Sequence, residues 1–319
     1  MNWKSVPAAL LAAVLGLGAI APAAAADDRR GHLPTNGPIA FGRVDPALDV
    51  FDLWVSRSNG SGQKRIVEGP TNFSDWSPDG RRIAFDFADE TGVHIATIAA
   101  DGSDRRVLTH AEGVQEAPDW SPDGQWIAYN QIMSFDPFLV SIWIMRSDGS
   151  AARQITNGAI DVEPVFSPDG ARVAFGRIAG DSPAGQLESV HVVKTDGTGL
   201  REVVPARAGL EHPDWSPTGR SIVFNIAPEA PQAPDTGAIL TVRPNGQGLR
   251  VLLRPTDDLL FFKPVWSPDG RRLLTGCYEV KAELERLCTV SKNGSAEVVV
   301  GGETKVNFPS WGPRPVRDR

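Results

Sequence analysis

The sequence is poor in several residue types, and each shortage narrows the fold class. Among 319 residues there are two cysteines, two tyrosines and three methionines. Two cysteines exclude a disulfide-dense miniprotein. The 32 glycines and 26 prolines are too many for a coiled coil and too few for collagen, and 41% hydrophobic residues exclude a polytopic membrane protein. Lys and Arg (32) are outnumbered by Asp and Glu (39), and the net charge of -7 argues against a nucleic acid partner.

The first 26 residues predict a cleaved export signal. Lys4 supplies a positive charge, residues 10–20 are apolar, and residues 24–26 fit the small-x-small cleavage pattern. The alternative is a membrane anchor, but the apolar run is short for a membrane span. We therefore expect a signal peptide at 1–26, an N-terminal tail at 27–38, and a secreted or periplasmic protein that does not span the membrane.

A repeated motif organises the rest of the chain. DWSPDG occurs at 75–80 and 119–124, related copies follow at 165–170, 214–219 and 265–270, and SWGPRP at 310–315 is a degenerate copy. The aromatic anchors of these copies are Trp76, Trp120, Phe166, Trp215, Trp266 and Trp311. Their spacings of 44, 46, 49, 51 and 45 residues are typical of a propeller blade of four strands.

Each repeat carries two turn signals, which predict where its strands end. Ser-Pro-Asp-Gly suits a tight turn, because Pro presets one dihedral and Gly accepts positive φ. An Asp-Gly or Asn-Gly pair follows in every repeat, as at 101–102 and 148–149. We therefore predict an all-β chain: a six-bladed β-propeller at 39–312, with four antiparallel strands per blade, and a C-terminal tail at 313–319.

The two ends of the repeat region indicate how the propeller closes. Residues 39–41 match a second strand of the repeat, but no Trp motif precedes them. The matching first strand lies at 308–312, at the other end of the chain. We expect this C-terminal strand to close the ring by joining the N-terminal blade; the alternative is an open array of six units.

The W-S-P-D-G repeat resembles that of TolB-type six-bladed propellers and is similar to the propeller of prolyl-oligopeptidase-type peptidases. The resemblance covers residues 39–312 and implies a propeller fold. TolB looks like a periplasmic protein with an extra α/β domain, which has no counterpart here, so we expect a stand-alone propeller. The peptidases carry an α/β-hydrolase domain, whereas this sequence has no G-x-S-x-G elbow, so peptidase activity is disfavoured.

The residues just before each anchor should line the mouth of the central channel, on the face with long, variable loops. The predicted ligand-binding mouth consists of Asn72, Glu116, Glu163, Glu211, His212, Lys263 and Asn307. We expect Asp75, Asp119 and Asp214 at the same mouth. Such an acidic mouth favours a cation or a basic peptide segment; the alternative is that these acids are solvated loop residues. No sequential Ca²⁺ loop is present, so we predict no cofactor, with Ca²⁺ as the alternative.

Two functional hypotheses follow. The first is an exported, non-catalytic, monomeric binding or scaffold propeller that engages a protein, a peptide or a cell-envelope component at the acidic mouth. The second is a polysaccharide lyase or hydrolase in which Glu211, His212 and Lys263 perform acid–base chemistry. A lyase acting on uronic acids needs basic groups to neutralise the substrate carboxylate, which disfavours the second hypothesis.

Cys277 and Cys288 lie in the predicted second and third strands of the last repeat. Antiparallel neighbours approach within disulfide range, so we expect a disulfide, with two free thiols as the alternative.

Overall fold

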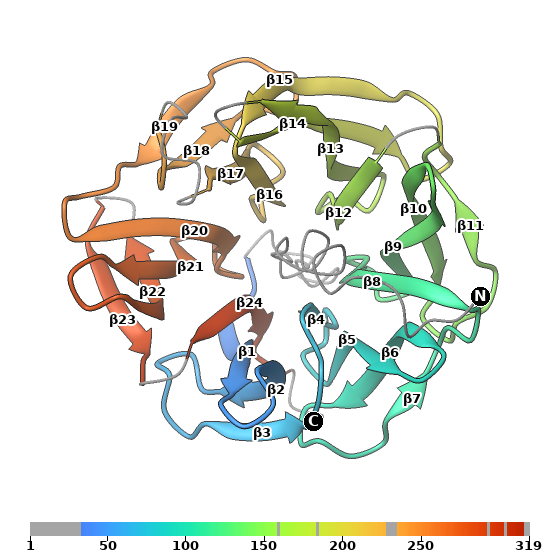
Figure 1. Ribbon diagram of the computed structural model, residues 1–319, viewed down its shortest axis with the longest axis horizontal. Helices are drawn as coiled ribbons and strands as arrows, with labels where there is room; N and C mark the ends of the chain where they lie inside the picture. Colours follow the sequence, from blue (N-terminus) through green and yellow to red (C-terminus); the bar gives the residue numbers. More distant parts are fainter. Residues whose placement is uncertain are drawn as a thin grey trace.

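The computed structural model describes residues 33–157, 160–182, 185–227, 235–291, 294–302 and 305–315. These residues form strands and turns, with no helix, and therefore no helix that could cross a membrane. Figure 1 shows the strands grouped around a common centre. The predicted signal peptide at 1–26 lies outside the described residues, as do residues 27–32 of the predicted tail at 27–38 and residues 316–319.

The strands follow the repeat, with the first unit assembled from both ends of the chain. Its strands are β1 (Asn36–Asp45), β2 (Val50–Ser56), β3 (Lys64–Val67) and β24 (Val306–Pro313). The next two units contain β4 (Ser74–Trp76), β5 (Arg82–Asp89), β6 (Gly92–Ala99) and β7 (Arg106–Val107), then β8 (Gly113–Trp120), β9 (Trp126–Phe135), β10 (Phe138–Arg146) and β11 (Arg153–Gln154). The remaining three contain β12 (Ile160–Phe166), β13 (Arg172–Ser182), β14 (Gly185–Lys194) and β15 (Arg201–Ala208); β16 (Leu210–Trp215), β17 (Ile222–Ile226), β18 (Ile239–Val242) and β19 (Arg250–Leu253); and β20 (Leu259–Trp266), β21 (Arg272–Glu279), β22 (Leu284–Ser291) and β23 (Ala296–Val300).

Within each unit, neighbouring strands pair antiparallel in the order of the repeat, and β24 pairs with β1. The anchor-bearing strands β4, β8, β12, β16, β20 and β24 lie nearest the centre in Figure 1. Short parallel pairings, β6 with β8 and β10 with β12, join three units into one twelve-stranded sheet. Strand β1 starts at Asn36, three residues before the predicted boundary at 39.

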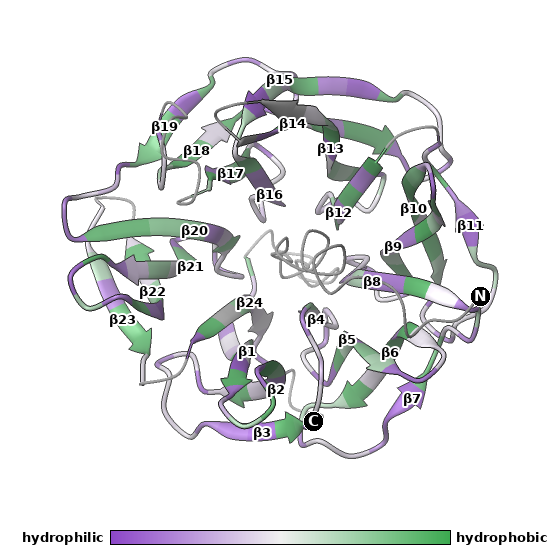
Figure 2. Cartoon of the chain, in the orientation of Figure 1, coloured by the Kyte–Doolittle hydropathy of each residue, from purple (hydrophilic) through white to green (hydrophobic). Residues whose placement is uncertain are grey.

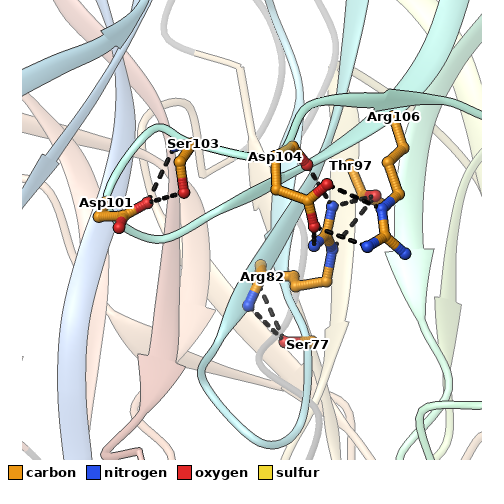
Figure 3. Close-up of polar contacts among 7 residues, drawn as sticks. All are labelled: Ser77, Arg82, Thr97, Asp101, Ser103, Asp104 and Arg106. Atoms are coloured by element: carbon orange, nitrogen blue, oxygen red, sulfur yellow. Dashed lines mark hydrogen bonds and ion pairs between the residues drawn. The ribbon is translucent and has the colours of Figure 1, made fainter.

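The turn chemistry explains why the sequence signals recur. Ser77 Oγ donates to Asp79 Oδ1 and accepts from the Arg82 amide, which closes the first turn. In the second turn, Asp101 Oδ1 accepts from the Ser103 amide and hydroxyl (Figure 3). The aspartates of both motifs are therefore turn-forming residues.

The turns of one unit also pack against the next. A β-carbon at Gly124 would lie 3.3 Å from the Pro78 ring, and one at Gly170 would lie 3.4 Å from Pro122. Both glycines have φ near +67°, so they combine a left-handed turn, which favours glycine, with a tight approach to the proline ring. The SPDG motif therefore serves the contact between units as well as the turn.

The hydrophobic core lies between consecutive units. One cluster joins Leu53 and Val67 of the first unit to Trp76, Ile83 and Phe85 of the second. Figure 2 shows the hydrophobic residues concentrated on the inner and middle strands, with hydrophilic residues prominent on the outer strands β3, β7, β11, β15 and β19. All six aromatic anchors are at most 8% exposed, so they pack the units together.

Cys277 and Cys288 form a disulfide between β21 and β22, with the two Cα atoms 6.0 Å apart. Thr275 pairs with Cys288, and Cys277 pairs with Arg286, so the disulfide runs diagonally across the strand pair. Both cysteines are buried among the apolar side chains between the last two units.

Candidate functional site at the channel mouth

Five of the six units share an unusual backbone conformation three residues before the anchor. The residues there have positive φ: Ala117 (52°), Glu163 (58°), His212 (56°), Lys263 (51°) and Phe308 (51°). Non-glycine residues rarely adopt this region. Three of the predicted mouth residues, Glu163, His212 and Lys263, therefore occupy the same position within their repeats, as an alignment of the repeats shows.

Side chains of the preceding unit hold these strained residues. Asn130 Oδ1 accepts from the Glu163 amide, and Asn225 Oδ1 accepts from the Lys263 amide, both at 3.0 Å. In the β12–β15 unit, Gly176 stands at the position of these asparagines and has no side chain to accept a hydrogen bond. Here Glu163 Oε2 accepts from the His212 amide instead, at 3.0 Å. The surrounding structure thus fixes the positive φ angles at the mouth.

His212 lies between two carboxylates. Its Nδ1 is 3.0 Å from Glu163 Oε2, and its Nε2 is 3.3 Å from Glu211 Oε2. Burial disfavours the imidazolium, but Glu163 and Glu211 outweigh it and raise the pKa of His212. We call Glu163, Glu188, Glu211 and His212 the His212 cluster.

Glu188, the fourth member of the cluster, was not predicted from the sequence. It comes from β14, and a β-carbon at Gly176 would lie 1.8 Å from its Oε1, so the missing side chain at 176 makes room for it. Burial raises the pKa of Glu188, and the charges of Glu163 and Glu211 add to the rise. The available signal was Gly176, which stands ten residues after its anchor where Asn130 and Asn225 stand after theirs.

Glu116 and Asp86 form a second acidic pair. Burial raises the pKa of Glu116, with further contributions from the charges of Asp86 and Glu163. Burial also raises the pKa of Asp86 to about 7, against the opposing effect of the Phe73 and Asn72 amides. Asn72 is half-buried, and its amide donates to Asp86 Oδ1 at 2.7 Å.

Lys263 and Asn307 complete the predicted set. The Lys263 ammonium lies 3.4 Å from the centroid of the Phe308 ring, a cation–π contact. Asn225 connects Lys263 to the His212 cluster, because its Nδ2 donates to Glu211 Oε2 at 3.4 Å while its Oδ1 holds the Lys263 amide. The Asn307 backbone pairs with Gly42; its side chain lies outside the described part of the chain.

Three further acids expected at the mouth are buried and accept from backbone amides of the next unit. Asp75 accepts from the Trp120 amide, Asp119 from the Phe166 amide and Asp214 from the Trp266 amide, at 2.7 to 2.9 Å. Each is at most 1% exposed, and burial raises the pKa of all three. An acid directly before the anchor therefore bonds to the backbone of the next unit.

No group of three His, Cys, Asp or Glu side chains among the described residues is arranged to hold a metal ion.

Antiparallel four-stranded units arranged around a centre define a β-propeller. The sequence pattern of the TolB beta propeller domain matches residues 40–315, and the chain belongs to this family.

The similarity to known proteins is strongest in the fold. TolB from Acinetobacter baumannii is 20% identical, with a TM-score of 0.72, over 88% of this chain and 68% of that one. An oligogalacturonate lyase in complex with manganese is 11% identical, with a TM-score of 0.55, over 83% of this chain and 74% of that one. An uncharacterized protein of Agrobacterium fabrum, Atu1656, is 30% identical over 162 residues, 49% of this chain; the match spans about half (54%) of that relative's length.

Proposed function

We propose that this chain is an exported binding or scaffold propeller that engages a basic segment of a protein, a peptide or a cell-envelope component at its acidic channel mouth. The observation that carries the proposal is the His212 cluster, in which acidic side chains of three strands, β12, β14 and β16, meet at one place. A concentration of one charge sign attracts the opposite charge and accelerates encounter. Membership of the TolB beta propeller family supports a protein-binding role and a periplasmic or secreted location.

The propeller is proposed to be a closed ring of six blades. Three contacts between the ends of the chain support closure. Strand β24 pairs with β1, a β-carbon at Gly80 would lie 3.3 Å from the Pro315 ring, and one at Gly60 would lie 1.6 Å from the Val299 carbonyl oxygen. The Gly80 contact joins the second unit to the C-terminal end of the first, and the Gly60 contact joins the first unit to the last.

The charges of the mouth favour binding over lyase chemistry. A uronic acid carries a negative charge, and the imidazole of His212 already lies against the side chains of Glu163 and Glu211. The Lys263 ammonium rests on the Phe308 ring. A positively charged segment is the ligand that the acidic side chains of the mouth would attract.

The experiment is a pull-down from envelope or secreted extract at low and high salt. Glu211 is the variant of choice, because its side chain is 17% exposed, and Glu211→Lys should lose the partners that the wild type retains at low salt. Glu297→Lys is the matched control: the Glu297 side chain is 74% exposed on β23, so this variant should retain them. Equal retention by Glu211→Lys and wild type would refute binding at the mouth.

Turnover separates the two functional hypotheses. The wild type, Glu211→Gln and His212→Ala are assayed on oligogalacturonate and other uronic-acid polymers. We expect no cleavage by any of the three. Cleavage by the wild type that both substitutions abolish would establish the lyase instead.

A further inference from the structure

A cavity opens between the second and third units, beside the outer strand β7. It has a volume of about 610 Å³, within the range of about 300–1,000 Å³ that is common for ligand pockets. The first turn of the second unit and both turns of the third unit form its walls. We call it the β7 groove, and its lining includes Asp79, Arg82, Arg106, Val107, Asp123 and Asp148, with the buried Trp120 at its floor.

One carboxylate holds two arginines back at the edge of the groove. Asp104 Oδ2 accepts from Arg82 Nη1 and from Arg106 Nη2, both at 2.7 Å (Figure 3). Asp104 Oδ1 also accepts from Arg106 Nε at 3.0 Å, and Thr97 Oγ1 accepts from Arg82 Nη2 at 3.0 Å. Both arginines are therefore tied to residues of their own unit, although the Arg106 side chain is 64% exposed.

In two other units, a basic side chain crosses to the next unit at this place. Arg201 and Lys64 stand at the position of Arg106, four residues after the glycine of the second turn. Arg201 Nη2 donates to the Pro244 carbonyl, and Lys64 Nζ donates to the Asp101 carbonyl at 2.7 Å. Pro244 and Asp101 both belong to the second turn of the following unit, so the chain itself supplies a cation to that turn.

The side chain of Asp104 explains why the second unit differs. Asp104 lies two residues after the glycine of its turn, with φ of 50°, and the same position is Gly62 in the first unit and Gly199 in the fourth. Neither glycine has a side chain that could hold a lysine or arginine back. In the third unit, the corresponding second turn, at Ser147 and Asp148, lines the cavity instead.

The charges around the β7 groove favour a cation. Asp79, Asp123 and Asp148 are exposed, and each accepts hydrogen bonds of its own turn through Oδ1. When Asp104 is included, four carboxylates stand against two guanidinium groups, so negative charge is in excess. Val107, which is 38% exposed, adds an apolar wall for the aliphatic stem of a lysine or arginine.

We propose that the β7 groove binds an arginine or lysine side chain of a partner protein. This side chain takes the place that Arg201 and Lys64 fill in their own units, and it donates to the second turn of the third unit and to the Asp148 carboxylate. The cation comes from another molecule, because Asp104 retains Arg106. The turn residues of the groove follow the anchors, whereas the mouth residues precede them, so this site is separate from the acidic mouth and does not depend on binding there.

The test is a titration of nitrogen-15-labelled protein with three blocked peptides, acetyl-Gly-Arg-Gly-amide and its lysine and glutamate counterparts, followed by amide chemical shifts. We expect saturable shifts at residues 104–108 and 147–149 with both basic peptides and none with the glutamate peptide. Added salt should reduce the affinity. Shifts at residues 211–212 report binding at the mouth, so the two sites are measured separately. The proposal is overturned if neither basic peptide shifts the groove residues at millimolar concentration.

Asp104→Gly tests why the groove is open. The variant restores the glycine of the first and fourth units, and a positive φ suits glycine, so the fold should be retained, as circular dichroism would confirm. Arg106 is then free to cross to the third unit, and the affinity for the arginine peptide should fall roughly tenfold or more. An anion held by Arg82 and Arg106 would give the opposite result, because both guanidinium groups would be released for it. Tighter binding of the glutamate peptide by Asp104→Gly would therefore overturn the proposal.

Two further variants test the sign of the charge that is recognised. Arg106→Ala removes a like charge and should strengthen binding of the arginine peptide, whereas Asp148→Asn should weaken it roughly threefold. Asparagine fits this turn, since Asn59 and Asn245 accept the corresponding amide hydrogen bond in other units. Asp196→Asn, in the second turn of the fourth unit, is the matched control and should leave binding unchanged. Loss of binding in Arg106→Ala, or equal effects of the two asparagine variants, would contradict a cation in the groove.

Discussion

At the scale of single residues, aspartates that look alike in the sequence have different roles. Asp123, in an SPDG turn, accepts from Ser121 and Gln125 within its own turn. Asp119, only four residues earlier, accepts from the Phe166 amide of the next unit. Asp86, ten residues after its anchor, accepts from two backbone amides close to the mouth. The position within the repeat, and not the residue type, decides which role each plays.

Asp86 predicts a pH dependence of stability. Its pKa is 3.8 without burial and about 7 in the folded chain, so the folded protein holds a proton that the unfolded chain releases between these values. The stabilising contribution is full below about pH 4 and is lost as the pH rises through about 7. Asp86→Asn keeps the acceptor oxygen and should flatten the decline in the free energy of unfolding between these pH values, measured in urea.

The control for this experiment is Glu297→Gln at an exposed site, which should leave the pH profile unchanged. Asn130 and Asn225 already fill the position of Asp86 in other units, so the fold tolerates the substitution. An Asp86→Asn profile as steep as that of the wild type would show that Asp86 does not hold the proton.

At the scale of the elements, each four-stranded unit is stabilised largely by its neighbours. Turn glycines pack on the prolines of the preceding turn, as Gly124 does on Pro78, and the core clusters take residues from adjacent units. The acids before the anchors add a hydrogen bond from one unit to the next. These contacts tie the position of each innermost strand to that of its neighbours.

Asp119 accepts a hydrogen bond from the next unit, whereas Asp123 accepts hydrogen bonds within its own turn, so the two residues offer a matched test of these two kinds of bond. Asp119→Ala leaves the buried Phe166 amide without its partner and should cost about 2 kcal/mol in the free energy of unfolding. Asp123→Ala breaks bonds within an exposed turn and should cost less than about 1 kcal/mol. Urea denaturation of both variants gives the comparison, and equal losses would contradict a specific role of Asp119 between units.

At the scale of the whole molecule, both chain ends meet in one unit. Trp311 of β24 packs with Ile39 and Phe41 of β1 and with Val265 and Leu274 of the last unit, and its indole donates to the Gly37 carbonyl at 3.2 Å. The C-terminal strand therefore belongs to the same core as the N-terminal strand. The proposed closure of the ring depends on this strand.

Removing β24 should open the ring. Deletion of 306–319 removes the partner of β1 and should accelerate amide exchange throughout β1–β3, and Trp311→Ala should cost about 3–5 kcal/mol through the cavity it leaves. Deletion of 316–319 alone is the control and should change neither quantity. Unaltered protection of β1–β3 in the longer deletion would speak against closure by β24.

The sequence determined the strands and the turns, because these depend on neighbours along the chain. The Trp spacing, the Ser-Pro-Asp-Gly turns and the Asp-Gly pairs specify four strands per unit without any knowledge of distant contacts. It also placed Glu163, Glu211 and His212 together, since all three lie close to an anchor on an innermost strand.

Only the tertiary structure decided what lies beside each side chain. It gave Asp75, Asp119 and Asp214 backbone amides of the next unit as partners, brought Glu188 over Gly176, and left the Gln115 amide without a hydrogen-bond partner among the described residues. These outcomes depend on whether the adjacent strand or unit offers a side chain, a backbone amide or a space. The repeat pattern describes one unit at a time, so it does not specify the contacts across the interface to the next.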